Sequence, residues 1–172
     1  VVSVATASAP VVVGSVEAGG GTGWLSGASS VAVVPDDARY VVVVAAGSSR
    51  LTVVDVSSAS SPSLVSSVSD GVTLAGGVDV AVRGGLAFVV SSSSDRVTVV
   101  SVTDPSSPSV VGSLSDGTRL AGASSVDVGS GYAYVAAPGF NGVSVLKYTE
   151  SSGSLAIVGS VSDASGLEGA SN

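Results

Sequence analysis

The sequence predicts an all-β protein built from short antiparallel strands in tandem, and two observations support this prediction. The first is composition, because valine and serine occupy 38 and 37 of the 172 positions, and β-branched residues favour pleated strands. Residues that favour helices are scarce, with one Lys, three Glu and no Met. The second observation is an internal repeat with a period near 46 residues.

The repeat is clearest where the chain leaves the last strand of each unit. Segments of the form Ser-x-Ser-Asp end at Asp70, Asp116 and Asp163, so these aspartates are 46 and 47 residues apart. A valine-rich segment recurs with the same spacing at residues 51–56, 97–102 and 143–148. A period of this length indicates one supersecondary unit that stacks on its neighbours.

The best-defined unit contains four expected strands, at residues 78–82, 86–90, 97–102 and 109–114. The segment Arg83-Gly84-Gly85 joins the first two strands and is typical of a hairpin, because glycine readily adopts positive φ angles. Four antiparallel strands in about 46 residues is the size of one β-propeller blade. A β-solenoid would need coils of roughly half that length, and a sandwich would not explain the tandem period.

These units predict one propeller domain or segment of about three and a half blades. Residues 1–26 form a half blade, since they contain matches to a third and a fourth strand only. Blades follow at about 27–70, 71–116 and 117–163, and residues 164–172 resemble the start of the next unit. Because an open arc exposes strand edges, we expect that the chain is a piece of a longer propeller or that a partner completes it.

The charge and the missing residue types exclude several classes of function. The net charge of −7 argues against nucleic acid, because phosphate binding needs clustered Lys and Arg. No apolar run is long enough for a membrane-spanning helix, so we expect no membrane insertion. Without His or Cys, the chain contains no Ser-His-Asp triad, no ordinary zinc site and no disulfide. The sequence therefore predicts that these residues are not an enzyme.

Three segments resemble the LVIVD-type propeller repeat: residues 51–56 (LTVVDV), 104–108 (DPSSP) and 131–136 (GYAYVA). The last unit, at 142–148 and 158–160, is also similar to YVTN and lactonase-like propellers. The resemblance implies blades rather than an activity, and such propellers are implied to be mostly secreted or surface proteins that act as scaffolds and binding modules.

One column of the resembled repeat is only partly present. The family pattern has an aspartate at the end of the third strand, and this chain retains it at Asp55. Ser101 and Lys147 stand at the corresponding positions of the next two units. This departure puts any functional role of the column in doubt.

Two aspartates are candidate binding residues. Asp79 and Asp127 are expected at the same position of consecutive units, near the start of the strand that lines the central channel. Carboxylates around a channel could form part of an oxygen-rich ring for Ca²⁺, although Ala32 stands at this position in the first unit. The alternative is that both aspartates accept backbone hydrogen bonds where blades meet. No other cofactor is expected.

Trp24 is the third candidate, because it lies in a glycine-rich loop between blades. Tryptophan is enriched where proteins contact partners, but this side chain could equally cap the edge of the core. Other acidic residues are typical of turns: Asp36-Asp37 lies between two strands, and Asp70, Asp116 and Asp163 follow strands. The serine clusters are expected to be solvated loops, with O-linked sugars as an alternative.

These observations predict a non-catalytic propeller scaffold that mediates protein–protein contacts in a surface, filament or lumenal assembly. Its partners would be other proteins or further blades of the same chain. One alternative is a lactonase-like or glycan-processing enzyme whose catalytic residues lie outside this segment. Another alternative is a Ca²⁺- or carbohydrate-binding adhesin. The expected location is secreted or cell-surface, with an organelle lumen as the alternative.

Overall fold

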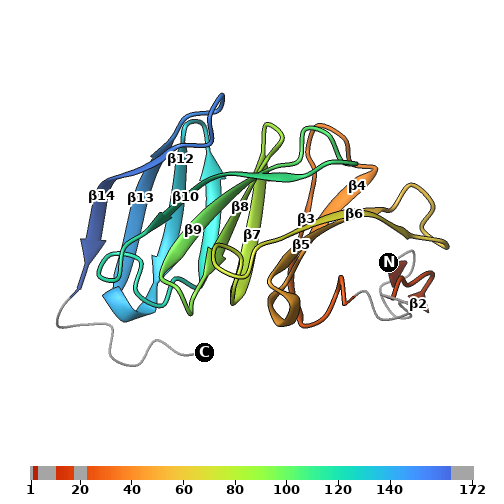
Figure 1. The fold of residues 1–172 in the computed structure, drawn as a ribbon, viewed down its shortest axis with the longest axis horizontal. Coiled ribbons are helices and arrows are strands. Elements are labelled where there is room, and N and C mark those ends of the chain that lie inside the picture. Colours follow the sequence, from red (N-terminus) through yellow and green to blue (C-terminus); the bar gives the residue numbers. More distant parts are fainter. Residues whose placement is uncertain (1, 4–10, 18–22, 164–172) are drawn as a thin grey trace.

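The computed structural model describes residues 2–3, 11–17 and 23–163, which form an arc of three four-stranded antiparallel sheets (Figure 1). We call these sheets blades I, II and III. Blade I comprises β3 (Ala28–Val33), β4 (Tyr40–Ala45), β5 (Arg50–Asp55) and β6 (Ser63–Ser69). Blade II comprises β7 (Gly77–Arg83), β8 (Leu86–Ser91), β9 (Arg96–Ser101) and β10 (Ser109–Ser115). Blade III comprises β11 (Ser125–Gly129), β12 (Tyr132–Ala137), β13 (Gly142–Tyr148) and β14 (Leu155–Ser162).

The remaining elements are short. Strands β1 (Val2–Ser3) and β2 (Val11–Val12) pair with each other ahead of blade I. The 3-10 turns η2 (Ala46–Ser48) and η3 (Pro138–Phe140) precede β5 and β13. Within the described residues, no helix is both long enough and apolar enough to cross a membrane. The all-β propeller fold predicted from the repeat is therefore confirmed.

Each blade is a meander in which consecutive strands pair. The four strands of blade II begin and end within one residue of the ranges expected from the sequence. Gly84 and Gly85 connect β7 to β8 with φ angles of 55° and 71°, which is the backbone that a two-residue hairpin requires. The glycine pair was therefore a correct signal for this turn.

A second turn recurs between the second and third strands of every blade. Ser49, Asp95 and Asn141 are 46 residues apart and have φ angles of 49°, 48° and 53°. Asp and Asn tolerate this left-handed region better than most residues. The Asp95 carboxylate also accepts a hydrogen bond from the Gly122 amide at 2.7 Å, which ties this turn to the loop that enters blade III.

The core lies in the two junctions where neighbouring blades pack face to face. Between blades I and II the buried side chains are Val34, Val42, Val44, Leu51, Val53, Leu74, Val80, Ala87, Val89, Val100 and Val102. Between blades II and III they are Leu86, Phe88, Val90, Val97, Val99, Leu120, Ala123, Val126, Ala133, Val135, Leu146 and Tyr148. Successive side chains of a strand point to opposite faces, so β8 of the central blade is buried along its whole length.

A buried hydroxyl anchors each inter-blade loop at the same position of the repeat. Thr52, Thr98 and Ser144 are fully buried in the third strands. Their hydroxyl groups donate to the carbonyl oxygens of Trp24, Thr73 and Arg119 at 2.7, 2.6 and 2.6 Å. Buried hydroxyls without partners are costly, and this contact satisfies the one polar side chain between apolar neighbours at each of these positions.

Replacing Thr98 by valine keeps the shape of the side chain but removes the donor to the Thr73 carbonyl. We expect the free energy of unfolding to fall by about 1–2 kcal/mol, measured by urea denaturation. Thr118→Val is the control, because Thr118 is exposed and should change stability by less than about 0.5 kcal/mol. An unchanged or raised stability for Thr98→Val would contradict the anchoring role.

Candidate functional site

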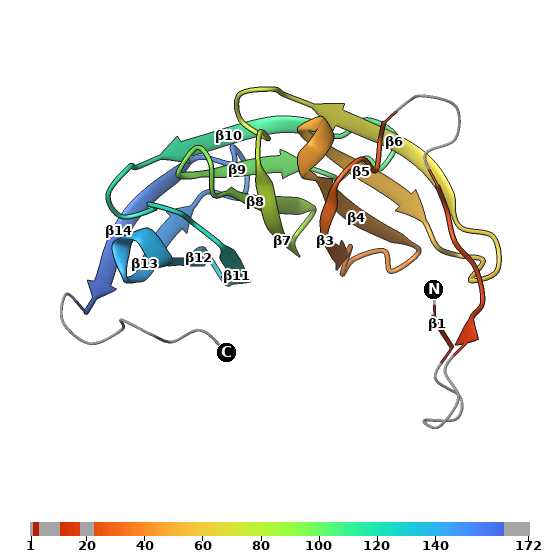
Figure 2. The same cartoon turned by 90° about the horizontal axis from the view of Figure 1, so that it is seen from below.

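The inner strands β3, β7 and β11 lie side by side on the concave side of the arc (Figure 2). The outer strands β6, β10 and β14 follow its convex side. In a propeller the inner strands surround the central channel, so polar residues on them are the first candidates for a site.

Asp79 joins all three blades from the middle inner strand. One carboxylate oxygen, Oδ1, accepts the Ser30 hydroxyl of blade I at 2.8 Å and the Val80 amide at 2.9 Å. The other, Oδ2, accepts the Ser125 hydroxyl of blade III at 2.9 Å and the Val126 amide at 3.0 Å. We call this arrangement the carboxylate clasp.

The clasp favours the ionised carboxylate. Burial is the largest single influence on the pKa of Asp79 and acts to raise it. The hydrogen bonds from Val126, Ser30, Ser125 and Val80 together outweigh burial, so the pKa lies below its usual value. Each carboxylate oxygen of Asp79 accepts two hydrogen bonds. Asp79 therefore has the hydrogen-bonding role where blades meet that the sequence offered as the alternative to binding Ca²⁺.

The expectation that Asp79 and Asp127 occupy the same position of the repeat is wrong. Asp79 lies opposite Val90, and the equivalent residues opposite Val44 and Ala136 are Ser30 and Ser125. The prediction failed because each aspartate lies in a Val-Asp-Val triplet, and these triplets are 48 rather than 46 residues apart. The triplets match in sequence, but the strand pairing places Asp127 two residues further along its strand than the position equivalent to Asp79.

Asp127 therefore has a different environment from Asp79. It is exposed, lies opposite Tyr134, and accepts a hydrogen bond from the Val128 amide at 2.8 Å. Ala81 and Ala32 stand at its position in the other blades. Within the part of the chain that the structure describes, no three acidic residues gather in a way that could hold a metal ion.

Trp24 is half-buried in the loop that enters blade I, and its carbonyl accepts the buried Thr52 hydroxyl. The structure thus gives its backbone an anchoring role, while a contact role for its indole stays a prediction.

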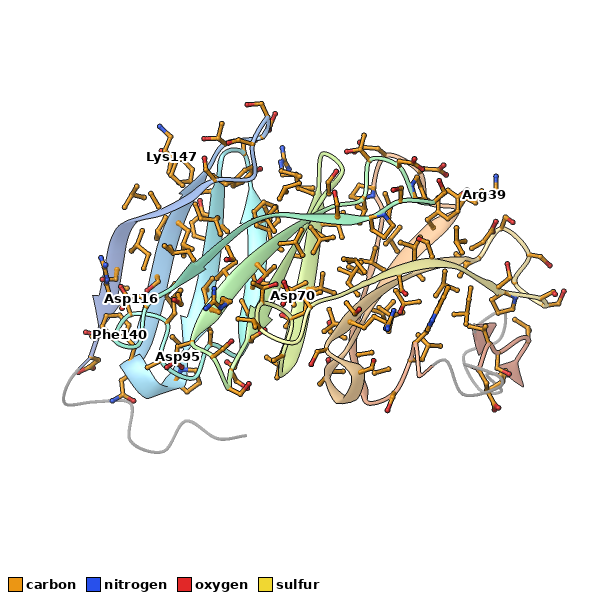
Figure 3. The ribbon with its side chains drawn as sticks, in the orientation of Figure 1. Arg39, Asp70, Asp95, Asp116, Phe140 and Lys147 are labelled. Atoms are coloured by element: carbon orange, nitrogen blue, oxygen red, sulfur yellow. The ribbon has the colours of Figure 1, made fainter. Side chains whose placement is uncertain are left out.

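The remaining sequence-predicted acidic residues lie in turns. Asp70 accepts the Val72 and Thr73 amides at 2.8 and 3.1 Å, and Asp116 accepts those of Thr118 and Arg119 at 3.0 and 2.8 Å. Asp37 accepts the Arg39 amide at 3.2 Å in the turn between β3 and β4. Asp95 and Asp116 lie at the edge of the arc opposite to Lys147 (Figure 3). The turn reading of Asp37, Asp70 and Asp116 is confirmed.

The family-type aspartate Asp55 also has a structural environment. Arg39 donates to its Oδ2 from Nε at 2.9 Å and from an Nη at 2.7 Å, and the Ser57 amide donates to its Oδ1 at 2.8 Å. The hydrogen bond from Arg39, followed by those from Ser57, lowers the pKa of Asp55 to about 2.

These carboxylates set the expected response of the fold to pH. The pKa values of Asp55, Asp70, Asp79 and Asp116 are lower in the folded chain than in an unfolded one. Their stabilisation is therefore complete above about pH 5, and it is lost as the pH falls from about 4 toward 2. With no histidine in the chain, we expect urea midpoints to be flat between about pH 6 and 8. A midpoint that rises on acidification below about pH 4 would contradict this assignment.

Sequence reasoning missed the feature that most distinguishes blade III, namely an open sheet face. Tyr132 and Tyr134 on β12 are 39% and 44% exposed, and Val143 on β13 is 39% exposed. In blade II the residues at these three positions are Leu86, Phe88 and Val97, of which none is more than 5% exposed. The same positions are thus core in blade II and surface in blade III.

Blade I also has an exposed sheet face, which is the face that points away from blade II. Val31 and Val33 of β3 are 62% and 53% exposed, whereas Val80, at the position of Val31 in blade II, is 5% exposed. An apolar groove of about 420 Å³ runs along this face, and Val16, Leu25 and Pro62 contribute to its walls.

One family model matches two of the three blades. The model of the LVIVD repeat matches residues 28–70 and 77–116, which contain blades I and II. No curated protein matches the chain in sequence.

Solved structures with the same fold are distant in sequence. A Lactobacillus plantarum protein has a TM-score of 0.67 at 22% identity, over 78% of this chain and 41% of that one. A candidate 6-phosphogluconolactonase of Bacteroides fragilis has a TM-score of 0.69 at 14% sequence identity, and the match covers 80% of this chain and 40% of that one. The periplasmic gluconolactonase of Pseudomonas aeruginosa has a TM-score of 0.63 at 13% sequence identity, and the match covers 77% of this chain and 40% of that one. The chain thus spans about two fifths of the length of these structures, it has the fold of β-propeller blades, and two of its blades match the LVIVD repeat.

Proposed function

We propose that the chain is a non-catalytic propeller scaffold that contacts other proteins through its open blade faces. The observation that carries the proposal is the exposed face of blade III. Tyr134 is 44% exposed, whereas Phe88, at the same position of blade II, is completely buried. Adjacent exposed apolar side chains on a sheet are typical of interaction surfaces.

The polar residues support a structural role rather than catalysis. The carboxylates that the sequence singled out mostly accept hydrogen bonds from turns or from neighbouring blades. The chain also has no His or Cys to act as base or nucleophile. Such contacts hold loops and blades in fixed positions, which is what a rigid scaffold requires.

A secreted or cell-surface location, with an organelle lumen as the alternative, is part of the proposal. One solved neighbour is described as periplasmic, and that description applies to that protein.

The scaffold proposal is tested by sedimentation velocity of the purified chain over a wide concentration range. We expect the wild-type chain to associate as its concentration rises, because open apolar faces associate in water. The double variant Tyr132→Ser/Tyr134→Ser should associate less. Val72→Ser is the control, since Val72 is 67% exposed but lies in an inter-blade loop. A wild-type chain that stays monomeric throughout, or a double variant that associates equally, would count against the proposal.

A lactonase-like enzyme is the second candidate, favoured by the solved neighbours that are named as gluconolactonases. In that case the catalytic residues would lie outside the residues described here. Hydrolysis of δ-gluconolactone by this chain above the spontaneous rate would favour the enzyme. We expect no acceleration by this chain, and a saturable acceleration would replace the scaffold proposal with the enzyme.

A further inference from the structure

A groove opens at the edge of the arc where blades I and II meet. Its volume is about 410 Å³, which is within the size range of ligand pockets. The floor is apolar, because it contains Val34 and Val102, which are 4% and 2% exposed, and the buried Gly85. The turns that follow β3 and β7 contribute to its walls and lie side by side at one edge of the arc (Figure 1). We call this hollow the junction groove.

The groove is held in shape by contacts within the chain. The Val102 amide donates to the Gly85 carbonyl at 2.8 Å, which fixes the floor. The Pro105 carbonyl accepts the Ser66 hydroxyl of blade I, which fixes one wall. Backbone hydrogen bonds of 3.0–3.1 Å close the turn between β3 and β4, which forms another wall. A partner would therefore meet a preorganised surface and lose little entropy in ordering it.

One wall of the groove carries two carboxylates. Asp36 and Asp37 both line it, and both are exposed. Asp37 accepts the backbone amide of Arg39 with one oxygen at 3.2 Å. Asp36 forms no hydrogen bond or ion pair with any residue that the structure describes. Two negative charges thus lie beside an apolar floor.

The nearest cations of the chain do not neutralise these carboxylates through ion pairs. Arg39 donates to Asp55 from Nε at 2.9 Å and from an Nη at 2.7 Å, and its guanidinium lies 5.0 Å from the centroid of the Tyr40 ring. Arg83, at the end of β7, donates to the Ser130 hydroxyl of blade III at 2.9 Å. Both side chains are thus engaged outside the junction groove, which leaves its charge available to a partner.

From the apolar floor and the two carboxylates we infer that the junction groove binds a lysine side chain of a partner protein. The aliphatic stem packs on Val34 and Val102, as long charged side chains commonly do on apolar surface. The ammonium group donates to Asp36 and Asp37. A lysine fits better than an arginine, because its three donors can reach two separate carboxylates, whereas the planar guanidinium matches a single one. This inference rests on the proposed scaffold function and names the partner chemistry of a surface distinct from the open blade faces.

A second groove, at the junction of blades II and III, provides an internal comparison. It has a volume of about 360 Å³ and shares Gly84 and Thr103 with the junction groove. The β7–β8 turn takes the place of the β3–β4 turn there, and its Arg83-Gly84-Gly85 sequence contains no acidic residue. Glu150 is the acidic residue in its lining. One carboxylate instead of a pair predicts weaker binding of a cation.

The test uses the full chain and a capped Ala-Ala-Lys-Ala-Ala peptide, followed by amide NMR. The same peptide with norleucine in place of lysine is the matched probe, since norleucine keeps an aliphatic stem but has no charge. We expect the lysine peptide to shift the amide signals of Gly84, Gly85 and Thr103 in a saturable way. The norleucine peptide should leave these signals in place.

Two variants then identify the charges that matter. The double variant Asp36→Asn/Asp37→Asn keeps the size of both side chains and should weaken binding roughly tenfold, since each exposed ion pair contributes about two- to fivefold. Glu150→Gln removes a charge from the second groove and should leave the affinity unchanged. All three positions are exposed, so the melting temperature should stay that of the wild type.

Several results would overturn the inference. These are groove amides that do not move at high peptide concentration, equal binding of the norleucine peptide, and equal weakening by the double variant and by Glu150→Gln, which would indicate attraction to the net charge alone. Tighter binding of the corresponding arginine peptide would overturn the assignment to lysine. If the chain associates through Tyr132 and Tyr134 while the lysine peptide moves no groove amide, the scaffold proposal stands and only this inference fails.

Discussion

Replacing Phe88 by alanine is expected to lower the free energy of unfolding by about 3–5 kcal/mol. Phe88 is completely buried in the junction between blades II and III, and its ring lies edge-on to Tyr148 with centroids 4.8 Å apart. The remaining neighbours are largely valines and leucines, which are too short to fill the cavity. A chain of this length should lose about 10 °C in melting temperature, or more.

Tyr134→Ala is the matched control, because Tyr134 stands at the position of Phe88 in blade III. Its side chain is 44% exposed, so its removal creates no enclosed cavity and should cost about 1 kcal/mol or less. Thermal unfolding followed by circular dichroism measures both variants. Equal losses would show that the open face of blade III is covered in solution.

Replacing Asp79 by alanine is expected to cost about 3 kcal/mol, because hydrogen bonds to a charged acceptor contribute more than neutral ones. The variant removes the shared acceptor of Ser30, Ser125 and the Val126 amide. It leaves these donors to find water or stay unpaired at the meeting point of three strands. Urea denaturation at neutral pH measures the effect, since the carboxylate is ionised there.

Asp127→Ala provides the comparison for Asp79, because both residues lie in Val-Asp-Val triplets. Asp127 is exposed and accepts only the amide of its own neighbour among the contacts that the structure describes. We therefore expect a change within about 0.5 kcal/mol. Similar losses for the two variants would argue against the carboxylate clasp.

The sequence predicted the repeating unit well because that unit depends on local patterns. A period near 46 residues, alternating valines and the Gly84-Gly85 turn all act over short distances, and the strands of blade II appear where these patterns place them. Turn aspartates such as Asp70 and Asp116 were recognisable for the same reason, since an Asx turn involves only the next few residues.

The site depended on register and on neighbouring blades, which local patterns do not report. Sequence matching paired Asp79 with Asp127, whereas the strand pairing makes Ser125 the equivalent of Asp79. Alternation of apolar residues along a strand also does not show whether a neighbouring blade packs on that face of the sheet. Phe88 and Tyr134 occupy the same position of the same strand, and only the presence of an adjacent blade makes one core and the other surface.

The carboxylate clasp also bears on how the arc responds to unfolding and to load. Repeat proteins usually behave as one-dimensional chains in which each unit is coupled only to its nearest neighbours. Ser30 and Ser125 belong to blades that share no core, yet both donate to Asp79. This contact adds second-neighbour coupling, so the three blades should melt as one cooperative unit rather than fray from an end. A pull on blade I would reach blade III through this ionised side chain as well as through the packing of blade II.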